Sequence, residues 1–152
     1  MGLLGKLQGK GGITIFVVNP PQEFDLFGAE LSKETTVIRS LAGDTAPALI
    51  LTFLGSQQEL QALVPQVMSR CSQETILWFA YPKLSSRTYR SDLTRDRGWE
   101  PLGALGFEPV RQVALDENWS ALRFKHVQTI RKLSRKESMA LSDEAKTRLR
   151  ER

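Results

Sequence analysis

Apolar residues in the first 125 positions fall into short runs separated by turn residues. The runs at residues 13–18, 47–54 and 75–81 are almost wholly apolar and rich in β-branched or aromatic side chains. Such runs are typical of buried strands in a parallel sheet that is covered on both faces. A shorter β-branched run at residues 35–39 predicts one more strand.

Two helices are predicted between the later strands. Residues 56–59, SQQE, form a capping box, and apolar residues then recur with helical spacing. Pro65 lies inside this pattern and is expected to kink or divide the helix. A short helix is predicted around residues 99–105, with Asp96 as its cap and Gly106 at its left-handed end.

The last apolar segments, residues 109–115 and 119–125, predict two strands joined by a turn at residues 116–118. Strands that alternate with helices and end in a hairpin predict an α/β fold. We expect a three-layer, Rossmann-like domain over residues 1–125. Its mostly parallel sheet is closed by the C-terminal antiparallel hairpin. Residues 126–152 are expected to form a basic helical or flexible tail.

The net charge of +4 is concentrated in this tail. Residues 123–152 carry ten Lys or Arg and four Asp or Glu, a net charge of +6, whereas residues 1–122 carry a net charge of −2. Three roles are open for the tail: a solvated helix, an arm that binds nucleic-acid phosphates, or a helix that binds a protein partner.

Few residues suit metal or nucleophilic chemistry. Cys71 and His126 are the only cysteine and the only histidine, so neither an internal disulfide nor a multi-cysteine zinc site is expected. His126 lies between the last strand and the tail and is interpreted as structural, which leaves no Ser-His-Asp or Cys-His mechanism. We expect no metal and no cofactor. The single cysteine and the short apolar runs favour a soluble, cytoplasmic protein.

The stretch VVNPPQEF at residues 17–24 raises a specific alternative. A strand that runs into Asn-Pro-Pro resembles the tetrapeptide with which amino-methyltransferases hold a target nitrogen. That tetrapeptide follows a later strand and ends in an aromatic residue, whereas Gln22 is fourth here. The glycines precede the strand, and Arg39 stands where an acidic residue would bind ribose hydroxyls. The stretch is therefore interpreted mainly as a strand stop.

Charged and aromatic residues gather after the fourth strand and in the hairpin. Ligands of open α/β sheets bind outside the carboxyl ends of the strands, which is where Lys83 is expected. Cationic side chains there would hold a phosphate or a carboxylate. The alternative is that these residues pair with one another and that Trp119 covers the sheet edge. The candidate ligand-binding residues are Lys83, Arg95, Asp96, Asp116, Trp119 and Arg123, and none is assigned a catalytic role.

Three motifs resemble a bacterial family of small proteins of unknown function, domain of unknown function 3052. They are LWFAYPK at 77–83, DLTRDRGWEPL at 92–102 and PVRQVALDENWSALRFK at 109–125. The resemblance covers most of residues 1–125. It implies a Rossmann-like fold with an element order similar to that of a trimmed methyltransferase, and it implies no activity.

The sequence favours a non-catalytic binding or accessory module, because the predicted scaffold lacks a glycine-rich cofactor loop and a paired acid and base. Its expected partner is a small anionic ligand or a protein, with no membrane involved. Two alternatives stay open: a divergent S-adenosylmethionine-dependent methyltransferase, and nucleic-acid binding through the basic tail.

Overall fold

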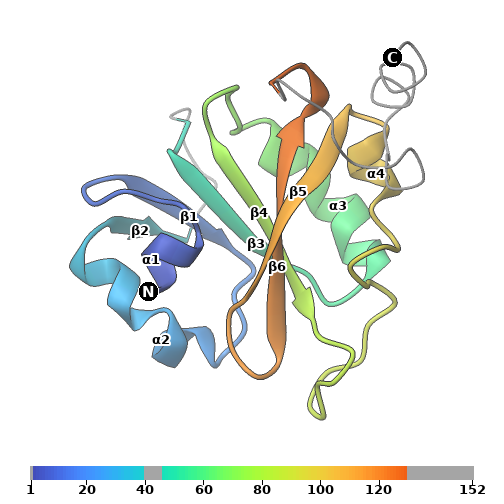
Figure 1. The fold of residues 1–152 in the computed structure, drawn as a ribbon, viewed down its shortest axis with the longest axis horizontal. Helices are drawn as coiled ribbons and strands as arrows, with labels where there is room; N and C mark the ends of the chain where they lie inside the picture. The colour runs from blue at the N-terminus through green and yellow to red at the C-terminus, as the bar shows by residue number, and fades with distance from the viewer. Residues whose placement is uncertain (1, 40–45, 130–152) are drawn as a thin grey trace.

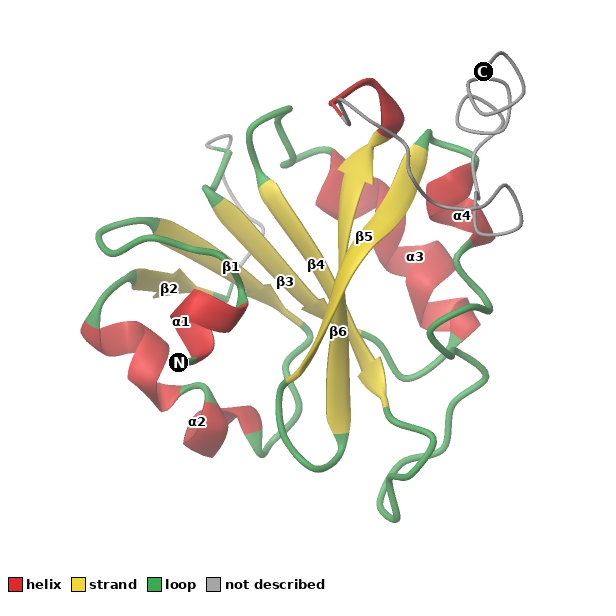
Figure 2. Ribbon diagram, in the orientation of Figure 1, coloured by secondary structure: helices red, strands yellow, loops and turns green. Residues whose placement is uncertain are grey.

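A computed structural model describes residues 2–39 and 46–129 as a six-stranded sheet with helices on both faces (Figure 1 and Figure 2). The strands are β1 (Thr14–Val18), β2 (Thr36–Ile38), β3 (Leu49–Phe53), β4 (Ile76–Pro82), β5 (Phe107–Ala114) and β6 (Trp119–His126). The helices are α1 (Leu3–Lys6), α2 (Phe24–Phe27), α3 (Gln57–Met68), α4 (Glu100–Gly103) and the 3-10 helices η1 (Ala29–Lys33) and η2 (Val127–Thr129).

The strand order in the sheet is β2-β1-β3-β4-β6-β5. The strand β1 pairs in parallel with β2 and β3, and β3 pairs in parallel with β4. The strand β6 is antiparallel to both β4 and β5, so β5 runs in the same direction as β4. The prediction of an α/β fold is confirmed. The last strand lies inside the sheet, between β4 and β5.

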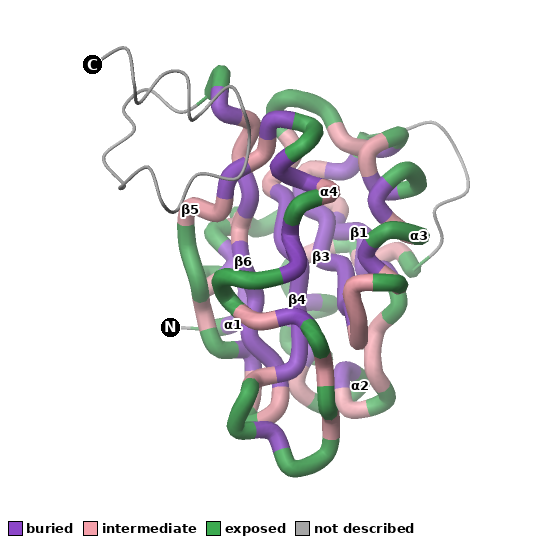
Figure 3. Tube along the Cα trace, turned by 90° about the vertical axis from the view of Figure 1, so that its right-hand side faces the viewer, coloured by how far each residue is buried: buried purple, intermediate pink, exposed green. Residues whose placement is uncertain are grey.

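Each face of the sheet has a hydrophobic core of its own. On one face, α1, α2 and η1 pack against alternate residues of the strands, such as Ile15 and Val17 in β1. On the other face, α3 and α4 cover the residues between them, such as Phe16 and Val18. Figure 3 shows similar burial along β3 and β4. Burial on both faces explains why the runs that form these strands are almost continuously apolar.

Trp78 joins the N-terminal segment to the middle of the sheet. Its side chain is fully buried in β4, and its Nε1 donates a hydrogen bond to the carbonyl oxygen of Leu7 at 2.9 Å. Leu3 and Leu4 are buried in the same core. This contact between residues 71 positions apart holds α1 against the sheet.

Several local predictions differ from the structure. The helices α2 and η1, of four and five residues, are absent from the prediction, because such short segments carry no clear helical period. Helix α3 is continuous through Pro65, which removes only one backbone hydrogen bond near the end of the helix. Asp96 does not cap α4, whose N-cap is Trp99 with no side-chain cap. Gly106 has the expected left-handed backbone, with φ of 89°.

The predicted tail lies largely outside the described residues. Residues 130–152 are not described, so the tail helices and the division of the chain at residue 125 stay predictions. Within residues 2–39 and 46–129, no helix has the length and apolar character that a membrane crossing needs.

The first prediction concerns the contact between Trp78 and Leu7. We expect Trp78→Phe to lower the free energy of unfolding by about 1–3 kcal/mol, because it leaves the Leu7 carbonyl without its donor. Trp119→Phe is the matched control, since the buried Nε1 of Trp119 has no hydrogen-bond partner among the described residues. Urea denaturation measures both variants. Equal losses would show that the hydrogen bond contributes nothing beyond ring packing.

Candidate functional site

The connections between the strands reverse direction at β1. The strand β2 lies on one side of β1 and β3 on the other, and the chain leaves β1 and β3 toward opposite faces of the sheet. In open α/β sheets, ligands bind at such a switch point, outside the carboxyl ends of the strands. The residues at this edge of the sheet are therefore the first candidates for a site.

Asn19 spans the switch point. It follows β1 directly and has a left-handed backbone, with φ of 56°. Its Nδ2 donates one hydrogen bond to the carbonyl oxygen of Phe53 at 3.0 Å and another to Oε2 of Glu59 at 2.8 Å. Asparagine adopts this backbone conformation more readily than most residues. One side chain thus joins the ends of β1 and β3.

Glu59 is fixed at the start of α3. Its Oε1 accepts a hydrogen bond from the backbone N–H of Gly55 at 2.8 Å, and its own N–H donates to Oγ of Ser56 at 3.1 Å. A Cβ atom at position 55 would lie 2.7 Å from Oε1 of Glu59, so glycine is needed for this contact. The switch point therefore carries a half-buried carboxylate of defined orientation.

A second carboxylate connects the loop after β1 with the loop after β4. The Oη of Tyr89 donates to Glu23 and lies 2.6 Å from Oε1 and 2.9 Å from Oε2. This hydrogen bond is the largest of the effects that raise the pKa of Tyr89 to about 12, because an ionised phenol would face the carboxylate. The Tyr89 ring also packs on Trp119, with ring centroids 5.0 Å apart.

A cavity of about 380 Å³ lies beside α2, η1 and β2. Arg39 and Asp25 line it and form an ion pair with a distance of 2.8 Å between Nη2 and Oδ1. The guanidinium of Arg39 also lies 5.6 Å from the ring centroid of Phe24. At the end of β2, where the sequence offers an arginine instead of an acid, an acidic side chain is thus supplied by α2.

Three of the six predicted site residues meet where β4 ends and β6 begins. The backbone N–H of Lys83 donates to the carbonyl oxygen of Asn118 at 2.8 Å. Asp116 Oδ1 accepts the backbone N–H groups of Asn118 and Trp119 and closes the turn before β6. Trp119 is buried and packs on Phe53, with ring centroids 5.2 Å apart. A ligand-binding role for Lys83, Asp116 and Trp119 stays a prediction.

The other three predicted residues lie apart from this group. Arg95 and Asp96 are exposed in the loop between β4 and α4. Both act on the pKa of Tyr81, which burial raises, which Arg95 lowers and which Asp96 raises by a smaller effect. Arg123 lies opposite Trp78 in β6 and donates from Nη1 to Oε1 of Gln8. Its own pKa is lowered, mainly by burial.

A second cavity, of about 420 Å³, lies at the opposite edge of the sheet, between the start of β4 and the end of β6. Cys71, Arg123 and His126 are among its lining residues. Burial raises the pKa of the Cys71 thiol, which keeps the thiol protonated at neutral pH and weakens it as a nucleophile. Within the described residues, no group of three or more His, Cys, Asp or Glu is placed to hold a metal ion.

Three residues of this edge, Glu23, Glu59 and Tyr89, were not predicted as site residues. Glu59 carries a signal, since it belongs to the capping box that directly follows a buried strand. Glu23 and Tyr89 lie 66 positions apart, and nothing in the sequence indicates that the two loops meet.

Comparison with known proteins identifies the kind of fold. No family model and no curated protein matches the chain. Among solved structures, a candidate type 11 methyltransferase of Sulfolobus solfataricus is similar at a TM-score of 0.51 and 10% identity, over 86% of this chain and 92% of that one. A methyltransferase of Aquifex aeolicus that depends on S-adenosylmethionine is similar at 0.50 and 14%, over 82% and 88%. The chain has a Rossmann-like fold similar to that of these methyltransferases.

These similarities contradict the prediction of a non-catalytic binding or accessory module. The prediction depended on the lack of glycine after the first strand and on the lack of a paired acid and base. The structure shows why the lack of glycine was a weak argument. Asn19 holds the left-handed backbone there, a conformation that glycine commonly supplies.

The second prediction uses the contact between Tyr89 and Glu23. We expect Glu23→Gln to lower the pKa of Tyr89 from about 12 toward the ordinary tyrosine value of about 10. In the wild-type protein, the stabilisation from the raised pKa is complete below about pH 10 and is lost as the pH rises toward about 12. Ultraviolet titration of tyrosinate measures the pKa.

Tyr81 and Tyr89 are the only tyrosines of the chain, so Tyr89→Phe isolates the titration of Tyr81 as a control. An unchanged titration of Tyr89 in Glu23→Gln would show that the carboxylate does not perturb the phenol.

Proposed function

We propose that the chain is a divergent methyltransferase that binds S-adenosylmethionine at the carboxyl ends of β1 and β3. The observation that carries this proposal is the bridge from Asn19 to Phe53 and Glu59, which places a fixed carboxylate at the switch point of a methyltransferase-like sheet. The sheet order and the fold similarities support it.

The donor set fits the chemistry of this cofactor. S-adenosylmethionine has no phosphate, so a glycine-rich loop whose backbone N–H groups bind phosphate is not required. It does carry ribose hydroxyls, an ammonium group and a sulfonium, all of which interact favourably with carboxylates. Glu59 and Glu23 lie at the ends of the loops after β3 and β1, and Asp25 lies beside the end of β2.

Each residue has a separate part in this proposal. Glu59 would hold a cationic or hydroxyl group above β3, and Asn19 keeps the Glu59 carboxylate in place. Asp25 would accept from the ribose hydroxyls, with Arg39 as its counter-ion. The bound cofactor would supply a methyl group on a positively charged sulfur, ready for transfer to a nucleophile.

We also propose a family, a cellular location, a closing hairpin and a basic tail for this chain. The motifs at residues 77–83, 92–102 and 109–125 support membership of domain of unknown function 3052. The single cysteine supports a cytoplasmic location.

The antiparallel pairing of β5 with β6 supports the closing hairpin, and the charge of residues 123–152 supports a basic tail.

The third prediction tests cofactor binding by calorimetry with the full chain. We expect S-adenosylmethionine to bind, and we expect Glu59→Gln to weaken binding about tenfold, because one charge-assisted interaction is lost. A smaller loss of affinity for the demethylated product, which lacks the sulfonium charge, would place Glu59 against the sulfonium. An equal loss would place Glu59 against the ammonium group or a ribose hydroxyl.

Glu74→Gln is the matched control, because Glu74 is exposed and lines the cavity at the opposite edge of the sheet. Urea denaturation of each variant verifies folding. Absence of any binding heat from the intact protein at high micromolar cofactor would overturn the proposal. Equal effects of Glu59→Gln and Glu74→Gln would remove Glu59 from the site.

A further inference from the structure

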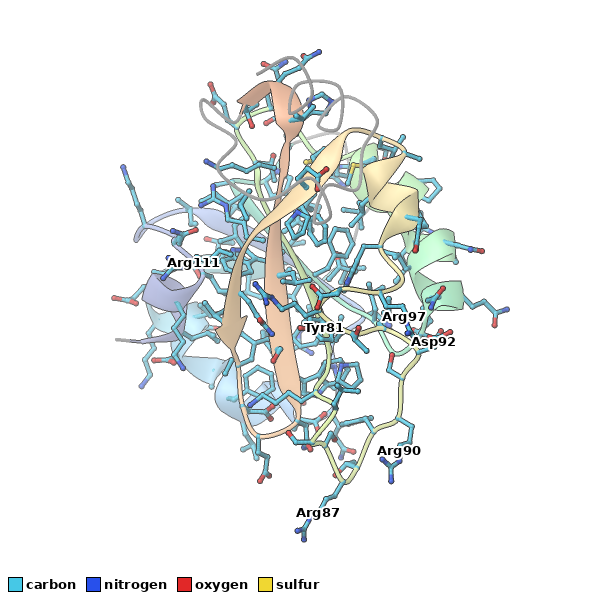
Figure 4. The ribbon with its side chains drawn as sticks, turned by 45° about the vertical axis from the view of Figure 1, so that its right-hand side comes forward. Tyr81, Arg87, Arg90, Asp92, Arg97 and Arg111 are labelled. Atoms are coloured by element: carbon cyan, nitrogen blue, oxygen red, sulfur yellow. The ribbon has the colours of Figure 1, made fainter. Side chains whose placement is uncertain are left out.

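The loop between β4 and α4 is the most cationic surface segment of the described chain. Residues 83–97 carry five cationic and two anionic side chains, a net charge of +3. Four of the five cations are arginines with exposed side chains: Arg87, Arg90, Arg95 and Arg97. Figure 4 shows Arg87 and Arg90 projecting outward from the loop.

These arginines are not neutralised by any carboxylate of residues 2–39 and 46–129. Across the two described segments, no carboxylate forms an ion pair with any arginine of residues 83–97. The nearby Asp92 is engaged elsewhere, since its Oδ1 accepts the backbone N–H of Gln57 at 2.8 Å and its carbonyl oxygen accepts Nε2 of Gln57 at 2.9 Å. The cationic charge of the loop is therefore available to a partner.

The loop is also held in a defined conformation. Oγ of Ser86 accepts the backbone N–H groups of Thr88 and Tyr89 and donates to Oδ1 of Asn118 at 2.8 Å. Further along, Nε1 of Trp99 donates to the carbonyl oxygen of Thr94 at 2.7 Å, and Leu93 is fully buried. Because the backbone is already ordered, little backbone conformational entropy is lost when the arginines bind a partner.

We propose that this arginine loop, residues 83–97, binds the phosphodiester backbone of a nucleic acid. Arginine presents a planar fork of N–H donors that matches phosphate oxygens in pairs. A protein interface needs a desolvated apolar centre. In this loop Leu84 is the only large apolar residue that is strongly exposed, so the loop lacks such a centre. The loop offers no exposed tryptophan or phenylalanine on which a base would stack. Binding is therefore carried by phosphate contacts and depends steeply on salt.

The position of the loop connects it with the proposed function. It leaves the carboxyl end of β4, and Tyr89 within it contacts Glu23 from the loop after β1. A nucleic acid on the arginine loop would thus lie at the same edge of the sheet as the switch point. That it is also the methyl acceptor rests on the proposed function, whereas the binding itself does not.

The fourth prediction is tested by fluorescence anisotropy of labelled RNA and DNA oligonucleotides with the full chain. With four phosphate contacts, affinity for a single strand should fall about 50-fold between about 50 mM and about 200 mM salt. In Arg87→Gln/Arg90→Gln, two contacts remain and the fall should be about sevenfold. RNA and DNA are measured separately, so the preferred strand identifies the source of the phosphodiester.

Arg111→Gln is the matched control, since Arg111 is exposed on β5 and lies far from Arg87 and Arg90 in Figure 4. It should leave the salt dependence almost unchanged. A variant of the same 152 residues with the tail cations at 131, 132, 135 and 136 replaced by glutamine separates the loop from the tail. Its salt dependence should stay close to that of the wild type.

Three results would overturn the arginine-loop proposal. They are no binding of either oligonucleotide at low salt, a loss of binding confined to the tail variant, and equal or tighter binding of a poly-glutamate peptide. Calorimetry with S-adenosylmethionine on Arg87→Gln/Arg90→Gln keeps the two proposals apart. In this variant, intact cofactor binding with weakened oligonucleotide binding supports the loop. In the wild-type protein, oligonucleotide binding without cofactor binding removes only the proposed function.

Discussion

The chain leaves the first strand in a left-handed turn, and the arrangement of the carboxyl edge depends on it. Asn19 takes this conformation and then fixes both Phe53 and Glu59 with one amide group. The two prolines that follow keep the exit from β1 stiff, because proline fixes its own φ and restricts the residue before it. As a result, the loops after β1 and β3 have fixed positions relative to one another.

The same edge is tied to the loop after β4 through the pair of Tyr89 and Glu23. Three loops from three neighbouring strands are thus connected by side chains rather than by regular backbone pairing. Such a connection gives each loop a defined position and still leaves carboxylates and guanidinium groups at the surface. The acidic groups lie near the switch point and the arginines lie on the loop beyond β4, so the edge has two regions of opposite charge.

Much of the fold could be predicted from the sequence, because burial on both faces leaves almost continuous apolar runs in β1, β3 and β4. The short helices α2 and η1 were missed since four or five residues carry no period. The candidate site was harder to predict from the sequence than the fold. Asn19 and Glu59 are 40 positions apart, and Asn19 holds the left-handed backbone that glycine commonly supplies after the first strand. The cations Lys83, Arg95 and Arg123 were predicted from the sequence. Only the structure shows that no carboxylate of the described residues forms an ion pair with them.

The insertion of β6 between β4 and β5 has a consequence for the newly made chain. During synthesis, β5 emerges before β6 and has no partner strand, and the adjacent edge of β4 stays open. The edge of β4 is apolar and can pair with other chains while it remains exposed. The sheet closes only when residues 119–126 leave the ribosome, so a chain stalled before this point would be a target for chaperones and proteases.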